Sequence, residues 1–125
     1  MLAIANSNSM VCHSLDRNTA FLHAPLLDNC RCFMQAPTGY VPPANRAGNC
    51  VRHQKALYGL KQAPREWNHT LVLYLTKQLG FTLFYSEPSV FNKGAGDDFI
   101  AISVHVDDQT IIARSLPPSL LSSLP

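Results

Sequence analysis

Two adjacent aspartates separate a pair of apolar, β-type runs near the end of the chain. Asp107 and Asp108 follow the run 99–106, and a second apolar stretch, 110–113, comes just after them. Two such runs around a short polar interruption predict an antiparallel hairpin with the aspartates at its tip. Adjacent carboxylates repel each other unless a cation lies between them, and Mg²⁺ takes carboxylate and phosphate oxygens together. The pair is therefore either a metal site or an ordinary β-turn, where Asp is common because it caps backbone groups.

The composition is that of a chain able to fold around one core. Its 125 residues correspond to a single domain or part of one. The hydrophobic fraction of 46% excludes wholesale disorder. The charged fraction is 14%, against about 25% in typical soluble domains, which indicates surfaces that other parts of a larger protein cover. The net charge of +2 permits contact with nucleic acid without arguing for it.

The sequence lacks the patterns typical of secreted, disulfide-rich or membrane proteins. Its four cysteines are too few for a disulfide scaffold, and neither they nor the five histidines show zinc-type spacing. No apolar segment approaches the roughly 20 residues needed to cross a bilayer. The start of the chain has no basic region typical of a secretory signal. We therefore expect an intracellular protein, in the cytoplasm or nucleus, with no membrane partner.

The order of local patterns predicts a mixture of helices and strands. A short helix is expected over 1–9, and a strand over 10–15 delivers Asp16 at its end. A compact turn is expected at 19–22, and the loop 36–49 is rich in proline and glycine. Further strands are expected at 30–35, 50–57, 81–85 and 89–92.

The clearest helix begins near Pro64, which suits a first helical turn because its missing N–H costs nothing there. Gly80 provides the stop. Four apolar side chains fall on one stripe at helical spacing, and we expect them to pack in the core: Trp67, Leu71, Tyr74 and Leu75.

Two expected strand ends carry carboxylates, Asp16 on one and the Asp107–Asp108 pair on the other. If these strands are neighbours, the three side chains meet at one edge of a sheet. Three carboxylates there could hold two metal ions about 3.5–4 Å apart, the arrangement used in phosphoryl and nucleotidyl transfer.

A block between these strands closely resembles the signature of Ty1/copia-type retrotransposon reverse transcriptases. The block is Lys-Ala-Leu-Tyr-Gly-Leu-Lys-Gln-Ala-Pro-Arg-Glu-Trp at 55–67. The segment 15–23 is similar to the first catalytic motif of that family, and 105–108 is similar to its Tyr-Val-Asp-Asp motif. Order and spacing agree, and the resemblance covers about residues 1–115.

The resemblance implies an α+β fold: a partial polymerase palm over 1–115, with an antiparallel sheet and helices packed on one face. It implies that Asp16, Asp107 and Asp108 are the catalytic carboxylates and bind two Mg²⁺ or Mn²⁺ ions. The backbone carbonyl of Arg17 would lie at the metal edge. The segment 116–125 is of low complexity, and we expect a disordered tail.

The resemblance also implies a nucleotide and template side. Phe21 falls where the family has an aromatic steric gate that crowds a ribose 2′-hydroxyl; the alternative is a core aromatic. Gln62 would line the nucleotide and template, with Lys61 and Arg65 near phosphates. The alternative for these two cations is a solvated helix start.

Three residues depart from the family pattern. Arg17 stands where an apolar residue is usual, and its side chain should point away from the metals into packed structure, where an unpaired guanidinium is costly. His105 replaces a tyrosine. Ala24 replaces a glycine, which matters if the backbone there needs a positive φ.

The family's fingers, thumb and RNase H segments are expected before Met1 and after the last motif, and a palm without them should be impaired or inactive.

Two classes of function follow. The first is a fragment of an RNA-directed DNA polymerase that acts on an RNA template, a DNA primer and dNTPs, with the rest of a retrotransposon polyprotein as a candidate partner. The alternative is a non-catalytic retroelement remnant, either inert or a weak nucleic-acid-binding module. A metallohydrolase using the same aspartates has no supporting nucleophile or base motif.

Overall fold

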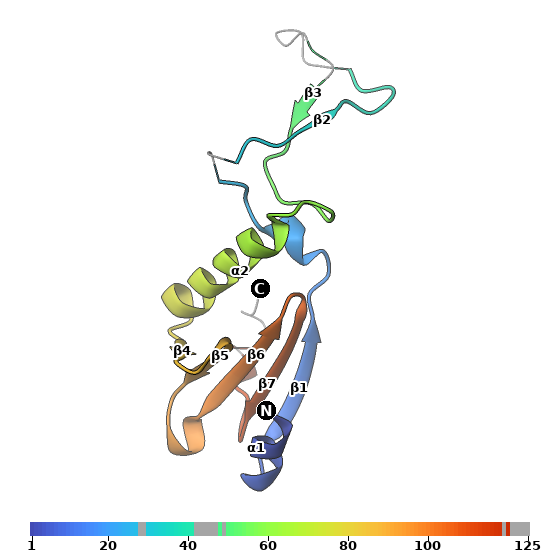
Figure 1. The fold of residues 1–125 in the computed structure, drawn as a ribbon. Helices are drawn as coiled ribbons and strands as arrows, with labels where there is room; N and C mark the ends of the chain where they lie inside the picture. The colour runs from blue at the N-terminus through green and yellow to red at the C-terminus, as the bar shows by residue number, and fades with distance from the viewer. Residues whose placement is uncertain (28–29, 42–47, 49, 119, 121–125) are drawn as a thin grey trace.

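The computed structural model describes residues 1–27, 30–41, 48, 50–118 and 120. A five-stranded antiparallel sheet in the order β1-β7-β6-β5-β4 forms the body, and a separate two-stranded ribbon pairs β2 with β3 (Figure 1). The helices and the sheet confirm the α+β class. The elements are α1 Leu2–Ser7, β1 Val11–Asp16, η1 Ala20–His23, β2 Phe33–Gln35, β3 Cys50–Arg52, α2 Ala63–Leu73, η2 Tyr74–Gln78, β4 Thr82–Phe84, β5 Glu87–Lys93, η3 Gly96–Asp98, β6 Ile100–His105 and β7 Asp108–Ala113.

Helix α2 covers one face of the sheet. It continues into η2, a single π-helical turn, and the chain leaves at Gly80, whose φ of +71° is the left-handed conformation that glycine adopts easily. The predicted apolar stripe is confirmed for its three buried members, and Tyr74 is half-buried. The stripe packs into the main core against the inward side chains of the sheet, which include Phe91, Ile102 and Ile111.

Helix α1 packs at the far end of the opposite face. Successive side chains of a strand point to opposite faces, so Ala101 and Ile112 lie on the side away from Ile102 and Ile111. Ala5 of α1 joins these two residues in a small second core. The other end of this face, where β1 and the β6–β7 hairpin finish, carries polar side chains.

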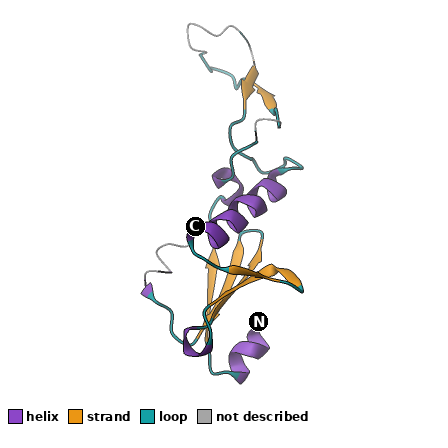
Figure 2. Ribbon diagram, turned by 90° about the vertical axis from the view of Figure 1, so that its left-hand side faces the viewer, coloured by secondary structure: helices purple, strands orange, loops and turns teal. Residues whose placement is uncertain are grey.

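The ribbon of β2 and β3 extends away from the sheet in both views (Figures 1 and 2). Its strands are shorter than the expected 30–35 and 50–57, with Phe33 paired to Arg52 at one end and Gln35 to Cys50 at the other. The side chains of β2 are all exposed, so burial does not favour a longer ladder. The expected loop 36–49 lies partly outside the described residues.

The C-terminal segment returns to the body. Leu116 and Leu120 pack against the main core. Residues 119 and 121–125 of the expected tail lie outside the described residues, so the boundary at 115 stays a prediction. Within the part of the chain that the structure describes, no helix is long and apolar enough to cross a membrane.

Candidate functional site

The sheet register brings two of the predicted carboxylates together. β1 and β7 are antiparallel, and Asp16 is directly opposite Asp108. The adjacent hydrogen bond runs from the Arg17 N–H to the Asp107 carbonyl at 3.0 Å. Asp16 and Asp108 therefore form a non-hydrogen-bonded pair, the type in which Cα atoms approach to about 4.5 Å and side chains lie closer. Both side chains are exposed, on the face of the sheet away from α2.

His105 extends this row by one strand, because it pairs with Asp108 on the other side. Residues directly opposite each other in an antiparallel pair share a face. Asp16, Asp108 and His105 therefore line the same end of one face. Two like charges opposite each other are destabilising unless a cation or a positive group offsets them.

The remaining aspartate lies in the turn itself. The hairpin connects His105 to Asp108 through Val106 and Asp107, so Asp108 is the first residue of β7 and not part of the tip. Val106 has a φ of +55°, whereas Asp107 does not have a positive φ. A two-residue turn with positive φ only at its first central position is type II′, where glycine is preferred. A β-branched residue in that conformation is strained.

Two hydrogen bonds from other elements reach this turn. The Trp67 indole N–H of α2 donates to the Val106 carbonyl at 2.5 Å. The second is the bond from the Arg17 N–H to the Asp107 carbonyl. The tip of the hairpin is thus attached to both α2 and the end of β1.

The side chain of Arg17 is half-buried, as expected for a residue that follows Asp16 on the other face. Its Nη2 lies 3.4 Å from Nδ1 of His23. Its Nε is buried without a hydrogen-bond partner, and the described residues supply no carboxylate for it. The anticipated cost therefore applies to the Nε of this guanidinium, whereas its Nη2 contacts His23.

A complete metal cluster is not assembled in the described part of the chain: no three Asp, Glu, His or Cys side chains converge there as metal ligands do. The available donors are carboxylate oxygens, the ligand type that Mg²⁺ and Mn²⁺ prefer. Asp16 and Asp108 lie opposite each other, with Asp107 on the adjoining turn. Metal binding by all three, and by the Arg17 carbonyl, stays a prediction.

Phe21 packs in the main core and is 9% exposed. Its ring lies 4.6 Å, centroid to centroid, from the ring of Tyr58, which is largely exposed. The core alternative is therefore observed, and the steric-gate role stays a prediction.

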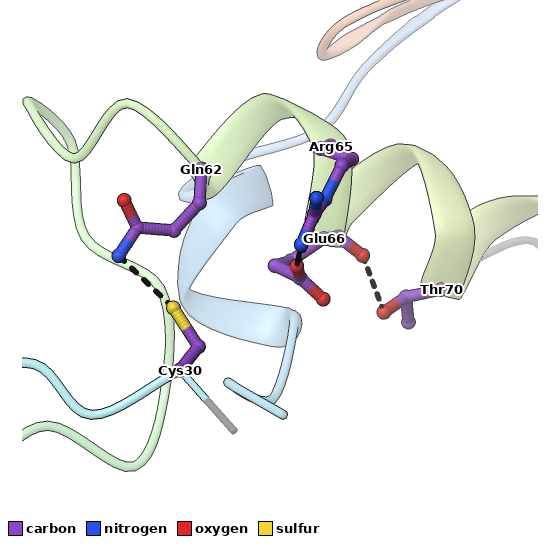
Figure 3. A network of polar contacts seen from close by, with 5 residues as sticks. All are labelled: Cys30, Gln62, Arg65, Glu66 and Thr70. Carbon is purple, nitrogen blue, oxygen red and sulfur yellow. Dashed lines mark hydrogen bonds and ion pairs between the residues drawn. The ribbon is translucent and has the colours of Figure 1, made fainter. Parts of the chain in front are cut away.

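Two of the predicted phosphate and template residues lie at the start of α2: Gln62 is its N-cap, and Arg65 is in its first turn (Figure 3). Gln62 donates from Nε2 to the Cys30 sulfur at 3.3 Å. Arg65 donates from Nη2 and Nε to one oxygen of Glu66, at 2.8 and 3.2 Å. These bonds and the charge of Glu66 raise the pKa of Arg65 above its usual range. Lys61 is exposed.

Glu66 was not singled out from the sequence, yet it is only 2% exposed. Its position next to Arg65 was visible, but the face of α2 that it occupies depends on tertiary packing. The buried carboxylate of Glu66 therefore fixes the orientation of the Arg65 guanidinium. Lys61 has no such partner among the described residues.

Comparison with known proteins identifies relatives over nearly the whole chain. A sequence model of the family described as "Reverse transcriptase (RNA-dependent DNA polymerase)" matches residues 1–117. The chain is 36% identical over 121 residues to the retrovirus-related Pol polyprotein from transposon RE1 of Arabidopsis thaliana, covering 97% of this chain and 8% of that protein. It is 33% identical over 115 residues to the corresponding polyprotein from transposon TNT 1-94 of Nicotiana tabacum, covering 91% and 8%.

A more distant relative is the transposon Ty1-MR1 Gag-Pol polyprotein of Saccharomyces cerevisiae, 28% identical over 118 residues, covering 92% of this chain and 6% of that protein. The chain thus spans less than a tenth of the length of these curated relatives. No solved structure matches it. The predicted resemblance to Ty1/copia-type proteins is confirmed.

Proposed function

The chain belongs to the reverse transcriptase family, and we propose that it forms the part of a retrotransposon RNA-directed DNA polymerase that carries the catalytic carboxylates. The observation that supports this proposal most is the register in which Asp16 faces Asp108, beside the turn that holds Asp107. Carboxylates from a first motif and a paired motif meet at one sheet end, although 90 residues separate them in the sequence. The reaction is attack of a primer 3′-hydroxyl on the α-phosphate of a dNTP, which forms a phosphodiester bond, breaks the bond between the α- and β-phosphates and releases pyrophosphate.

Asp16, Asp107 and Asp108 would hold two Mg²⁺ or Mn²⁺ ions. When bound, such ions stabilise the charge on the attacking and leaving oxygens of an in-line displacement. The aspartates supply the oxygen ligands and the negative charge that attract the ions to this end of the sheet. The Arg17 carbonyl would complete the metal edge.

The remaining candidate residues would orient the substrates. Lys61 is exposed and suited to pair with a phosphate as a point charge. Arg65 would contact a phosphate through its planar guanidinium, which Glu66 orients. Gln62 would contact the nucleotide or the template through its side-chain amide. Phe21, supported by Tyr58, would limit the space at the ribose 2′ position. RNA template, DNA primer and further parts of a retrotransposon polyprotein are the partners that this function implies.

A primed poly(rA) extension assay tests the proposal, with Mg²⁺ or Mn²⁺ and with Asp107→Asn as the comparison. We expect weak, metal-dependent incorporation that Asp107→Asn abolishes. Asp98→Asn is the matched control, because it makes the same charge change in the exposed η3 turn. Incorporation no greater than that of Asp107→Asn would reject catalysis by this chain.

The second candidate is a non-catalytic retroelement remnant or a weak nucleic-acid-binding module. The unpaired Nε of Arg17 beside Asp16 favours it, because the departure from an apolar residue carries an energetic cost without an evident catalytic gain. Salt-sensitive binding to an RNA–DNA hybrid without nucleotide incorporation would support a binding module. Absence of both would leave an inert remnant.

A further inference from the structure

Both carbonyl groups of the strained turn are bonded to other elements. Trp67 donates to Val106, and the backbone of Arg17 donates to Asp107. A residue in a rarely populated conformation keeps it only where the surrounding structure holds it there. For Val106, these two bonds add to the His105–Asp108 strand pair that closes the turn.

Core packing alone does not require an indole at position 67. Trp67 is 2% exposed and belongs to the main core. A phenylalanine ring would fill much of the same apolar space without an N–H group. A buried indole N–H normally finds an acceptor, and here the acceptor lies 39 residues further along the chain, in the turn.

We propose that Trp67 is a positioning residue whose indole N–H fixes the peptide between Val106 and Asp107 and thereby the direction in which the Asp107 side chain leaves the turn. This proposal rests on the proposed function only in treating Asp107 as a metal ligand. The sequence pattern assigned Trp67 to the core; its hydrogen bond gives it a second role.

The physical reason lies in the geometry of two-residue turns. Type II′ and type I′ turns are related by a flip of the central peptide, and type I′ has positive φ at both central residues. The flip would turn the Val106 carbonyl away from Trp67 and move Asp107 to a positive φ. Losing one hydrogen bond of ordinary strength shifts such an equilibrium roughly fivefold. The indole therefore biases the turn toward one orientation of Asp107.

The test compares Trp67→Phe with Leu71→Val, a buried change one helical turn along α2 that removes no hydrogen bond to the hairpin. Amide hydrogen exchange at Val106, Asp107 and Asp108 is measured by NMR after both variants are normalised for global stability. We expect exchange in this turn to be at least fivefold faster in Trp67→Phe. Equal rates in the two variants would overturn the proposal.

A second measurement needs no variant. Trp67 is the only tryptophan in the chain, so its indole N–H resonance is unambiguous. Strong protection of this proton from exchange supports the bond to Val106, and exchange at the rate of a free indole overturns it. Mn²⁺ titration separates the two proposals: absence of broadening at the aspartates in the parent chain contradicts the proposed function, while the exchange rates still decide the role of Trp67.

Discussion

Val106 has the backbone conformation that glycine would be expected to provide. Its φ of +55° brings a β-branched side chain into the left-handed region, and strain of this kind costs on the order of 1–3 kcal/mol. The chain retains it at the turn that carries Asp107. Departures from favourable local geometry are concentrated at functional sites, where the surrounding contacts maintain them.

Replacing Val106 with glycine should raise the free energy of unfolding by about 1 kcal/mol, because the positive φ then carries no steric penalty. Urea denaturation measures the change. Val106→Ala is the control, since it removes the two methyl groups but keeps Cβ and the strain. A gain no larger for glycine than for alanine would refute the strain argument.

Arg17 is the second costly residue at this end of the sheet. Arg17→Met keeps an unbranched apolar stem and removes the guanidinium, with its buried, unpartnered Nε and its contact to His23; we expect a gain of about 1–2 kcal/mol in the free energy of unfolding. The exposed Arg31→Met should change it by less than about 0.5 kcal/mol. Thermal and urea denaturation of both variants provide the comparison, and a loss of stability in Arg17→Met would contradict the assignment.

At the scale of elements, strong periodic patterns predicted what the structure contains. The stripe of α2, its stop at Gly80 and the hairpin around Asp107 depend on local sequence, and all three are observed. The ends of the strands were less predictable: β2 and β3 are shorter than expected, and the side chains of β2 are all exposed, so burial does not favour a longer ladder. The replacement of a glycine by Ala24 causes no backbone strain, because φ at this position is −85°, a value open to any residue.

The side-chain partners of the site could not be read from the sequence, because they join segments far apart in the chain. The bond from Trp67 to Val106 and the burial of Glu66 both depend on how α2 lies on the sheet. Resemblance to a family identified the aspartates, whereas the register between Asp16 and Asp108 required the structure.

Gly80 offers a test at the scale of the helix. Gly80→Ala should lower the free energy of unfolding by about 1 kcal/mol, because a Cβ disfavours the φ of +71° that ends the helix. Space is not the obstacle, since the nearest atom to an added Cβ, the Lys93 Nζ, is 3.8 Å away. Gly80→Asn should lose less, because asparagine tolerates this conformation. Equal losses in the two variants, measured by urea denaturation, would argue against the conformational explanation.

For the whole molecule, stability resides in the sheet and α2 and not in the projecting ribbon. Phe91 of β5 is 1% exposed and lies in the main core, whereas Phe33 of β2 is 59% exposed. The exposed apolar side chains of the ribbon agree with the low charged fraction of the chain.

Replacing each of these two phenylalanines by alanine compares the contribution of the core with that of the ribbon to the free energy of unfolding. Phe91→Ala should lower the free energy of unfolding by about 3–5 kcal/mol, as for a buried aromatic in a core. Phe33→Ala should change it by less than about 0.5 kcal/mol, as for an exposed side chain. Circular dichroism during urea denaturation measures both. Comparable losses would mean that the ribbon is part of the cooperative core.

The claim on which the function depends is that the carboxylates of two separate strands act on the same cation. Titration of the ¹⁵N-labelled chain with Mn²⁺ tests it, because a bound paramagnetic ion broadens the nearest amide signals first. We predict early broadening at Asp16, Asp107 and Asp108 together, weakened by Asp16→Asn and unchanged by Asp98→Asn. Broadening that appears first at the acidic turn of η3, or that Asp16→Asn leaves unchanged, would contradict a shared cation at these carboxylates.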